Sequence, residues 1–169
     1  MIKIILIFST FFLDRLSKIY LLNLQANGTD IDFYVFPFLN FNLVWNTGIG
    51  FGLISLETNI FYHILTLIIA AVNIVLIFFI IKSKGIYVYL LALIIGGSLG
   101  NLFDRIYYYA VPDFIDFHIG NFYDRIVFEA VPDFIDFHVE NFHWFIFNVS
   151  DIFICLGVIF MIILEIVSN

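Results

Sequence analysis

The sequence contains little charge, and very little of it is positive. Asp, Glu, Lys and Arg together make up 12% of the 169 residues, which is roughly half of their share in an ordinary soluble domain. This composition excludes a soluble globular domain. The chain has only seven Lys and Arg and a net charge of −7. Because phosphate binding needs clustered basic residues, we expect no nucleic acid among its partners.

The sequence also lacks the usual signs of a serine or cysteine nucleophile. It has no G-x-S-x-G motif, and its single cysteine, Cys155, has no His near it in the sequence. One cysteine excludes an intramolecular disulfide. Cys155 lies in an apolar run, so we expect it to be a small buried side chain.

Hydrophobic residues are abundant, at 63% of the chain. A helix needs about 20 mostly apolar residues to cross the hydrocarbon core of a bilayer, and four stretches are long enough. We therefore expect an all-α polytopic membrane protein with four transmembrane helices, forming a single membrane domain over residues 1–169. The expected spans are approximately residues 2–22, 60–81, 86–103 and 144–167.

Basic residues near the apolar stretches predict the orientation. Lys3 precedes the first stretch, and Lys82 and Lys84 lie between the second and the third. Because basic residues favour the cytoplasmic side, both termini are predicted to be cytoplasmic. The loops predicted to lie outside are residues 23–59 and 104–143.

The first of these outer loops has a β-like pattern. Residues 30–45 alternate polar and apolar side chains and are rich in Phe, Tyr and Val, which predicts short strands. Aromatic rings favour the boundary between membrane and water. We therefore expect a small β-rich outer loop that lies on the membrane interface.

The second outer loop contains a tandem duplication. Residues 100–119 and 120–139 are identical at fourteen of twenty aligned positions. A solenoid needs at least three repeats, and the second copy follows D-F-I-D-F-H rather than an apolar span. We interpret the second copy as an enlargement of the loop.

Carboxylates in the apolar part of the chain are the main functional candidates. Asp151 lies seven residues into the fourth stretch, with Asn148 one helical turn before it, and a carboxylate at membrane depth is costly and functional by default. Asp113, or its copy Asp133, offers a second carboxylate. Two carboxylates brought together share one proton, so the chemistry best supported is activation of water by such a pair.

Two other clusters of polar residues carry weaker predictions. Asp14 and Lys18 are four residues apart and share a helix face, so they are expected to pair. Asp113, Asp116 and His118 form a D-x-x-D-x-H pattern with ligand types that suit several divalent ions. Its spacing matches no zinc pattern, and we expect no metal.

Five segments, in order along the chain, resemble the lipoprotein signal peptidases (signal peptidase II). They are D-R-x-x-K at residues 14–18, N-x-G at 46–48, G-G-x-x-G-N-x-x-D-R at 96–105, V-x-D-F at 111–114 and again at 131–134, and F-N-x-x-D at 147–151. Each motif is weak alone, but together they are specific and extend over nearly the whole chain.

The resemblance implies an aspartic endopeptidase that cleaves lipid-modified prolipoproteins before the diacylglyceryl-cysteine, without metal or cofactor. It implies a catalytic dyad of Asp151 with Asp113 or Asp133. The residues implied to bind substrate or to support the site are Asp14, Lys18, Asn46, Gly48, Asn101, Arg105 and Asn148. We expect a monomer in contact with membrane lipids, in the bacterial cytoplasmic (inner) membrane, with its active site toward the outer side.

Of the two copies, Asp113 is favoured. It keeps an unbroken connection to Asn101 in the third stretch, and loops tolerate insertions after it at small entropic cost. Asp133 remains the rival because it keeps the approximate spacing to Asp151. Two alternative functions stay open, a catalytically impaired lipoprotein- or lipid-binding relative and, less favoured, a proton or ion pathway.

Overall fold

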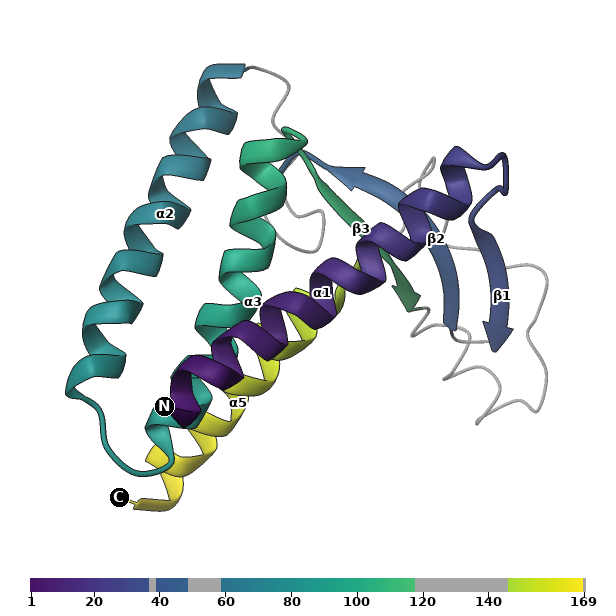
Figure 1. Cartoon of the computed structure of the whole chain (residues 1–169). Helices are drawn as coiled ribbons and strands as arrows, with labels where there is room; N and C mark the ends of the chain where they lie inside the picture. Colours follow the sequence, from purple (N-terminus) through teal and green to yellow (C-terminus); the bar gives the residue numbers. More distant parts are fainter. Residues whose placement is uncertain (37–38, 49–58, 118–145, 169) are drawn as a thin grey trace, which may run out of the picture.

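The computed structural model describes residues 1–36, 39–48, 59–117 and 146–168. The described helices form a bundle, and a small sheet projects from its side (Figure 1). The helices are α1 (Ile2–Ala26), α2 (Asn59–Lys82), α3 (Tyr87–Tyr107) and α5 (Val149–Ser168). Helix α3 is the central one, because it packs against each of the other three.

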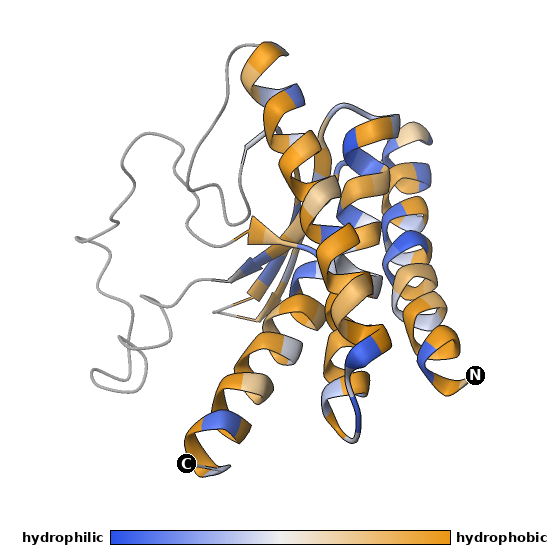
Figure 2. Ribbon diagram, turned by 90° about the vertical axis from the view of Figure 1, so that its left-hand side faces the viewer, coloured by the Kyte–Doolittle hydropathy of each residue, from blue (hydrophilic) through white to orange (hydrophobic). Residues whose placement is uncertain are grey.

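Among the described residues, three helices are long and apolar enough to cross a membrane. These are α2, α3 and α5, and hydrophobic residues dominate their surfaces (Figure 2). Helix α1 is similar in length but carries Lys3, Asp14, Arg15 and Lys18. The protein is therefore mostly helical, with three candidate membrane spans and a small antiparallel sheet.

The helix boundaries differ from the predicted spans in one place that matters for the site. The last helix begins at Val149, not at Trp144, because Ile146 and Phe147 form a short strand that pairs with another strand. Asp151 thus lies in the first turn of its helix, not two turns inside it. Helices α1 and α3 are also longer than predicted and end at Ala26 and Tyr107.

Glycines of α3 allow its neighbours to approach very closely. A Cβ atom on Gly96 would lie 2.7 Å from the Ile7 carbonyl oxygen of α1, and one on Gly97 would lie 2.6 Å from the Ser150 carbonyl oxygen of α5. Both distances are too short for a real side chain. These two glycines therefore allow close helix packing, which brings the polar residues of three helices together.

The sheet has four antiparallel strands in the order β1-β2-β3-β4. They are β1 (Asp32–Phe36), β2 (Leu39–Asn46), β3 (Val111–Phe117) and β4 (Ile146–Phe147). Strands β1 and β2 lie in the loop where the sequence predicts strands. Strands β3 and β4 were not predicted; β3 contains Asp113, and β4 leads into α5, which contains Asp151.

A small apolar core fastens the sheet to the helices. Leu21 of α1, Ile31 before β1 and Phe114 of β3 are buried together. Val149, the first residue of α5, packs against the same cluster. Because Phe114 is the neighbour of Asp113, its burial here fixes β3 and turns the Asp113 side chain toward the opposite face of the strand.

Candidate active site

A pocket of about 240 Å³ opens where α3, α5 and the ends of β2 and β3 meet. Both Asp113 and Asp151 line it. The other lining residues are Asn46, Ile69, Ser98, Asn101, Arg105, Val111 and Ile154. The pocket therefore brings together residues from five elements that are far apart in the sequence.

Asp113 is buried and bound by two amides. Only 3% of it is exposed. The Nδ2 atoms of Asn46 and Asn148 donate to its two carboxylate oxygens, at 2.9 Å and 2.6 Å. In the described part of the chain, no Lys or Arg forms an ion pair with it.

Asp151 is held in a similar way at the start of α5. The Nδ2 atom of Asn101 donates to one of its oxygens at 2.8 Å, and the backbone N–H of Asn148 donates to the other at 3.1 Å. The backbone N–H of Asp151 donates in return to the Asn148 Oδ1 at 3.2 Å. Asn148 therefore caps α5 and contacts both aspartates, which we call the paired aspartates.

Burial and the neighbouring carboxylate both act on Asp113. Burial, followed by the charge of Asp151, raises the pKa of Asp113 from 3.8 to about 7. Two like charges at one buried site cannot both ionise easily. The raised pKa of Asp113 therefore favours retention of a proton at this site near neutral pH.

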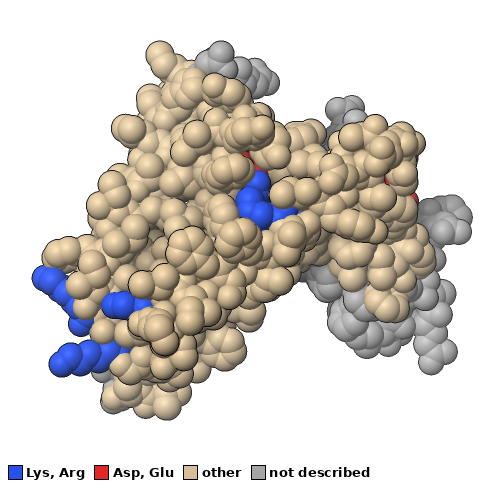
Figure 3. Space-filling model, viewed as in Figure 1, with Lys and Arg blue, Asp and Glu red and all other residues tan. Residues whose placement is uncertain are grey.

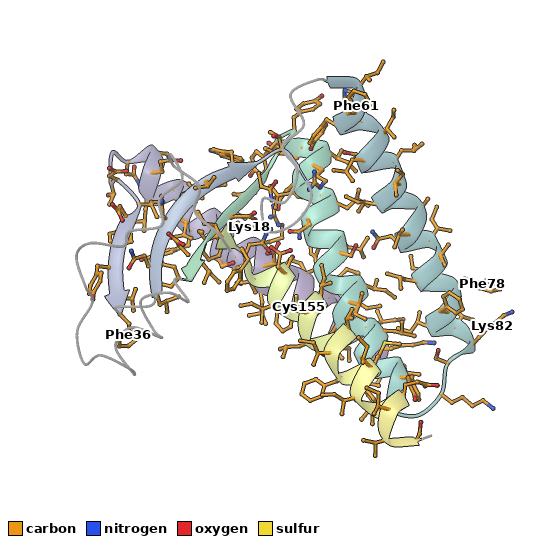
Figure 4. All side chains as sticks on the ribbon, turned by 180° about the vertical axis from the view of Figure 1, so that it is seen from behind. Lys18, Phe36, Phe61, Phe78, Lys82 and Cys155 are labelled. Atoms are coloured by element: carbon orange, nitrogen blue, oxygen red, sulfur yellow. The ribbon has the colours of Figure 1, made fainter. Side chains whose placement is uncertain are left out.

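Four buried charges lie directly beside the pair, and we call Asp14, Arg15, Lys18 and Asp104 the ionic cluster. Lys18 donates to Asp14 at 2.9 Å and to Asp104 at 2.7 Å. Arg15 pairs with Asp104, and at 3.4 Å with Asp14. Lys18 points into the centre of the protein between the helices (Figure 4). The predicted pairing of Asp14 with Lys18 is thus present, within a larger neutral cluster.

Two contacts join the ionic cluster to the pair. Lys18 donates to the Asn101 Oδ1 at 3.0 Å, and the amide of Asn101 donates to Asp151. The backbone N–H of Ser150 donates to the free oxygen of Asp14 at 3.0 Å. Asp14 therefore accepts a hydrogen bond from the first turn of α5. This contact helps to position Asp151, which lies in the same turn.

Arg105 supports the other side of the pocket. Its Nη2 donates to the Gly48 carbonyl oxygen, and the Gly48 N–H donates to the Asn46 Oδ1 at 2.8 Å. Tyr62 donates to the Arg105 carbonyl oxygen at 2.9 Å. The Nε and Nη1 atoms of Arg105 are buried and have no partner among the described residues.

Three residues around the site, Asp104, Arg15 and Tyr62, were not among the predicted site residues. Asp104 and Arg15 stand inside the recognised motifs, next to residues that were singled out, and their charges in an apolar stretch were the available signal. No sequence signal pointed to Tyr62, because its contact with Arg105 joins residues that are 43 positions apart.

Some predictions fall outside the described residues. The rival Asp133 and the histidine of the D-x-x-D-x-H pattern, His118, lie in residues 118–145. Asp116 is described and is buried, but it lies three positions from Asp113 on the same strand and so faces the other way. Within the described ranges, no group of three His, Cys, Asp or Glu side chains is placed to hold a metal ion.

Together these features define a class of protein. Two carboxylates share a buried pocket, four amide or backbone N–H groups orient them, and apolar helices long enough to cross a membrane carry the pocket. Such an arrangement is typical of an intramembrane aspartic peptidase.

Comparison with known proteins gives the particular family. The family model described as signal peptidase (SPase) II matches residues 6–119 and 118–167. The lipoprotein signal peptidase of Pelagibacter ubique is 42% identical over 168 residues, covering 99% of this chain and 89% of that protein. That of Anaplasma phagocytophilum is 37% identical, covering 97% and 91%. The chain belongs to the signal peptidase II family.

Solved structures agree with this assignment. A bacterial membrane enzyme matches with a TM-score of 0.67 and 28% identity, over 97% of this chain and 87% of that one. A second bacterial membrane enzyme matches with a TM-score of 0.63 and the same identity. The two segments of the family match meet at residues 118–119, so each segment includes one complete copy of the V-x-D-F element.

Proposed function

We propose that this protein removes signal peptides from lipid-modified prolipoproteins, cleaving before the diacylglyceryl-cysteine, with Asp113 and Asp151 as its catalytic residues. The observation that carries the proposal is the shared contact with Asn148. One asparagine binds Asp113 through its side chain and Asp151 through its backbone, which keeps both carboxylates at one pocket.

The reaction uses the single proton of the paired aspartates. The ionised carboxylate accepts a proton from water as the water oxygen attacks the scissile carbonyl carbon. The protonated carboxylate donates to the carbonyl oxygen, giving a neutral tetrahedral diol. A proton then passes to the amide nitrogen, the C–N bond breaks, and the products are a carboxylic acid and an amine.

The residues around the pair keep this geometry. Asn46 and Asn148 orient Asp113, and Asn101 orients Asp151. Arg105 and Gly48 position Asn46. Asp14 and Lys18 support Asn101 and the start of α5. Because the donors to the pair among the described residues are uncharged, the pair keeps the proton that the reaction needs.

We assign the catalytic role to Asp113 rather than to Asp133. Asp113 follows α3 after the short turn at Tyr108–Ala110, and β3 pairs with β2 so that Val44 lies opposite Asp113 and Asn46 opposite Val111. This pairing brings the Asn46 amide to the carboxylate. The second copy then enlarges the segment that follows β3.

We propose that α1 is a fourth membrane span, although it is the least apolar helix. Its charged residues Asp14, Arg15 and Lys18 are buried inside the protein, and Asp104 completes a neutral set, so little charge faces lipid. Both termini and the α2–α3 turn lie at the same end of the bundle (Figure 1). Basic side chains gather at this end (Figure 3), which supports a cytoplasmic location for it.

The active site is then directed toward the outer side of the bacterial cytoplasmic membrane, and the sheet lies on the membrane interface. Large side chains of β1 and β2 are exposed there, namely Phe33, Tyr34, Phe36 and Trp45. Aromatic side chains of this kind favour the headgroup region and provide a surface for lipids and for the lipid-modified substrate. The proposed active unit is a monomer, and residues of a single chain are sufficient to line the pocket around both aspartates.

The test is cleavage of a diacylglyceryl-modified prolipoprotein by the full chain reconstituted in lipid vesicles. The new N-terminus is identified by mass spectrometry, and we expect it at the lipid-modified cysteine. Asp113→Asn is expected to abolish cleavage, and Asp133→Asn to leave it within about twofold of the unchanged protein. Asp32→Asn, at an exposed position of β1, is the matched control.

The outcomes separate the possible errors. Loss of cleavage in Asp133→Asn with full activity in Asp113→Asn would transfer the role to the second copy. Binding of the precursor without turnover by the unchanged protein would contradict the proposed reaction.

A further inference from the structure

The pocket continues past the paired aspartates to a third polar side chain. Ser98 lines it together with Asp113, Asp151 and Asn101. Ser98 lies one helical turn before Asn101 on α3, about 4.5 Å deeper along the helix axis at the usual rise per residue. The other lining residues from the helices, Ile69 and Ile154, are apolar, so Ser98 is the polar group at this depth of the pocket.

A residue of another helix fixes the Ser98 hydroxyl. Asn73 of α2 is 2% exposed, and its Nδ2 donates to the Ser98 Oγ at 2.8 Å and to the Ile69 carbonyl oxygen at 2.9 Å. A carbonyl oxygen only accepts, so the amide nitrogen must face both partners. Ser98 is therefore an acceptor toward Asn73.

This arrangement leaves the hydroxyl proton of Ser98 available. Within the described ranges, the Ser98 hydroxyl has Asn73 as its partner and donates to no other group. A serine within a helix commonly donates to the carbonyl one turn before it. Here the Asn73 amide occupies one lone pair of the oxygen, and the hydrogen is free to donate into the pocket.

A peptide cleaved at membrane depth needs such a donor. To reach the paired aspartates, the peptide must leave its helical conformation around the scissile bond, because a helical carbonyl is already bonded. Each carbonyl freed in this way lacks a partner in an apolar environment, at a cost of several kcal/mol. A donor beside the pocket removes that cost for one carbonyl.

We propose that Ser98 binds a backbone carbonyl of the signal peptide, and that Asn73 is the residue that positions it. This rests on the proposed function, in which the active site is directed toward the outer side of the membrane. The signal peptide, on the amino side of the scissile bond, then lies deeper in the membrane than the bond itself. An extended chain advances about 3.3 Å per residue, so a depth of about 4.5 Å corresponds best to the second residue before the scissile bond. Ser98 is thus a subsite residue rather than a catalytic one.

The first test is a set of variants assayed for cleavage of the modified precursor. Ser98→Ala is expected to raise KM about 3- to 10-fold with kcat unchanged, as for the loss of one neutral hydrogen bond made equally in ground and transition states. Ser98→Thr, which keeps the hydroxyl, is expected to restore most of the affinity. Asn73→Leu is expected to raise KM by a smaller factor, and Ser83→Ala, just after α2 and with an exposed hydroxyl hydrogen bond, is the matched control.

The second test changes the substrate. The peptide bond between the second and first residues before the scissile bond is replaced by an ester, which weakens that carbonyl as an acceptor. We expect the ester to raise KM for the unchanged protein and not for Ser98→Ala, because the contact is already absent there. An ester placed four residues before the scissile bond should affect both proteins equally.

The outcomes distinguish this inference from an error in the proposed function. If the unchanged protein cleaves the precursor but Ser98→Ala has the same KM, or loses thermal stability alone, the Asn73–Ser98 contact only joins α2 to α3 and the subsite is disproved. Additive effects of the ester and Ser98→Ala would overturn it as well. If the unchanged protein cleaves nothing, the proposed function itself has failed.

Discussion

The protein buries two neighbouring pairs of aspartates, and the partners of the two pairs differ in charge. In the ionic cluster, Asp14 and Asp104 face Lys18 and Arg15, so two negative charges meet two positive charges. In the pocket, the described partners of Asp113 and Asp151 are amide and backbone N–H groups. Burial is similar in the two places, and the difference lies in the charge of the partners.

The comparison shows how a fold decides whether a buried acid is structural or reactive. A cation keeps a carboxylate ionised and in place, and its removal leaves an uncompensated charge. An amide orients a carboxylate without supplying charge, so a pair bound only by amides must retain a proton. The chain joins both arrangements through Asn101, which accepts from Lys18 and donates to Asp151.

The largest expected effect comes from removing one acid from each group. Asp151→Asn keeps the size of the side chain but removes the shared proton, so cleavage should fall by a factor of about 10² to 10⁴ with the melting temperature nearly unchanged. Asp104→Asn should instead lower the melting temperature. Parallel cleavage and thermal unfolding assays in detergent micelles measure both. If Asp151→Asn cleaves the precursor at a rate within tenfold of the unchanged protein, the distinction between a reactive and a structural pair of aspartates is wrong.

The next effect concerns the cation at the centre of the ionic cluster. Lys18→Met leaves Asp14 and Asp104 with Arg15 alone, and breaking a buried pair in this way costs about 3–5 kcal/mol. Unfolding in denaturant measures the loss, with the exposed Lys84→Met as control. Adding Asp104→Asn to Lys18→Met should recover part of the stability. A double variant less stable than Lys18→Met would show that Asp104 does not need the cation.

The pH dependence of the paired aspartates should be opposite to that of a salt-bridged acid. The folded-state pKa of Asp113 is about 7, above its unfolded value. The stability from this group is therefore complete below about pH 4 and is lost as the pH rises through 7. Relative to Asp113→Asn, the unchanged protein should lose on the order of 2–3 kcal/mol between pH 5 and pH 8.

Activity should follow the same proton. Cleavage measured as kcat/KM should decline above about pH 7, when the pair loses its proton. A flat profile between pH 7 and pH 9 would contradict a shared proton at this pair.

The smallest expected effect tests the packing that holds the ionic cluster beside the pair. A Cβ atom on Gly100 would lie 2.4 Å from the Ser150 Oγ and 2.6 Å from the Asp14 Oδ2, so Gly100→Ala should cost about 1–3 kcal/mol. Ser150→Ala removes the nearer of these atoms, an oxygen without a partner among the described residues. It should recover part of the loss when combined with Gly100→Ala, as measured by thermal unfolding. No recovery would place the strain at Asp14 alone.

The sequence predicts those parts of the molecule that depend on local pattern. Long apolar runs give helices close to the observed α2 and α3, and alternation in residues 30–45 gives β1 and β2. The four-residue spacing of Asp14 and Lys18 gives their contact. Each of these follows from helix or strand periodicity within one segment.

What the sequence does not predict depends on contacts between distant segments. The predicted start of α5 was too early because Ile146 and Phe147 fit the pattern of an apolar helix. Their strand conformation depends on pairing with β3, which is distant in the sequence. The same holds for Asp104 and for Asn73, whose partners come from another helix. In these cases the tertiary neighbour decides the role, and single-sequence periodicity carries no information about it.

The position of the tandem repeat relative to α3 and β3 has a consequence for removal of one of its copies. The repeated residues begin in α3 and continue beyond β3, so excision of either 20-residue copy leaves one G-N-x-x-D-R element joined to one V-P-D-F element in the same reading frame. Gly120, Asn121 and Asp133 would then take the places of Gly100, Asn101 and Asp113. Removal of either copy would therefore shorten the chain by 20 residues and still leave every residue type of the site.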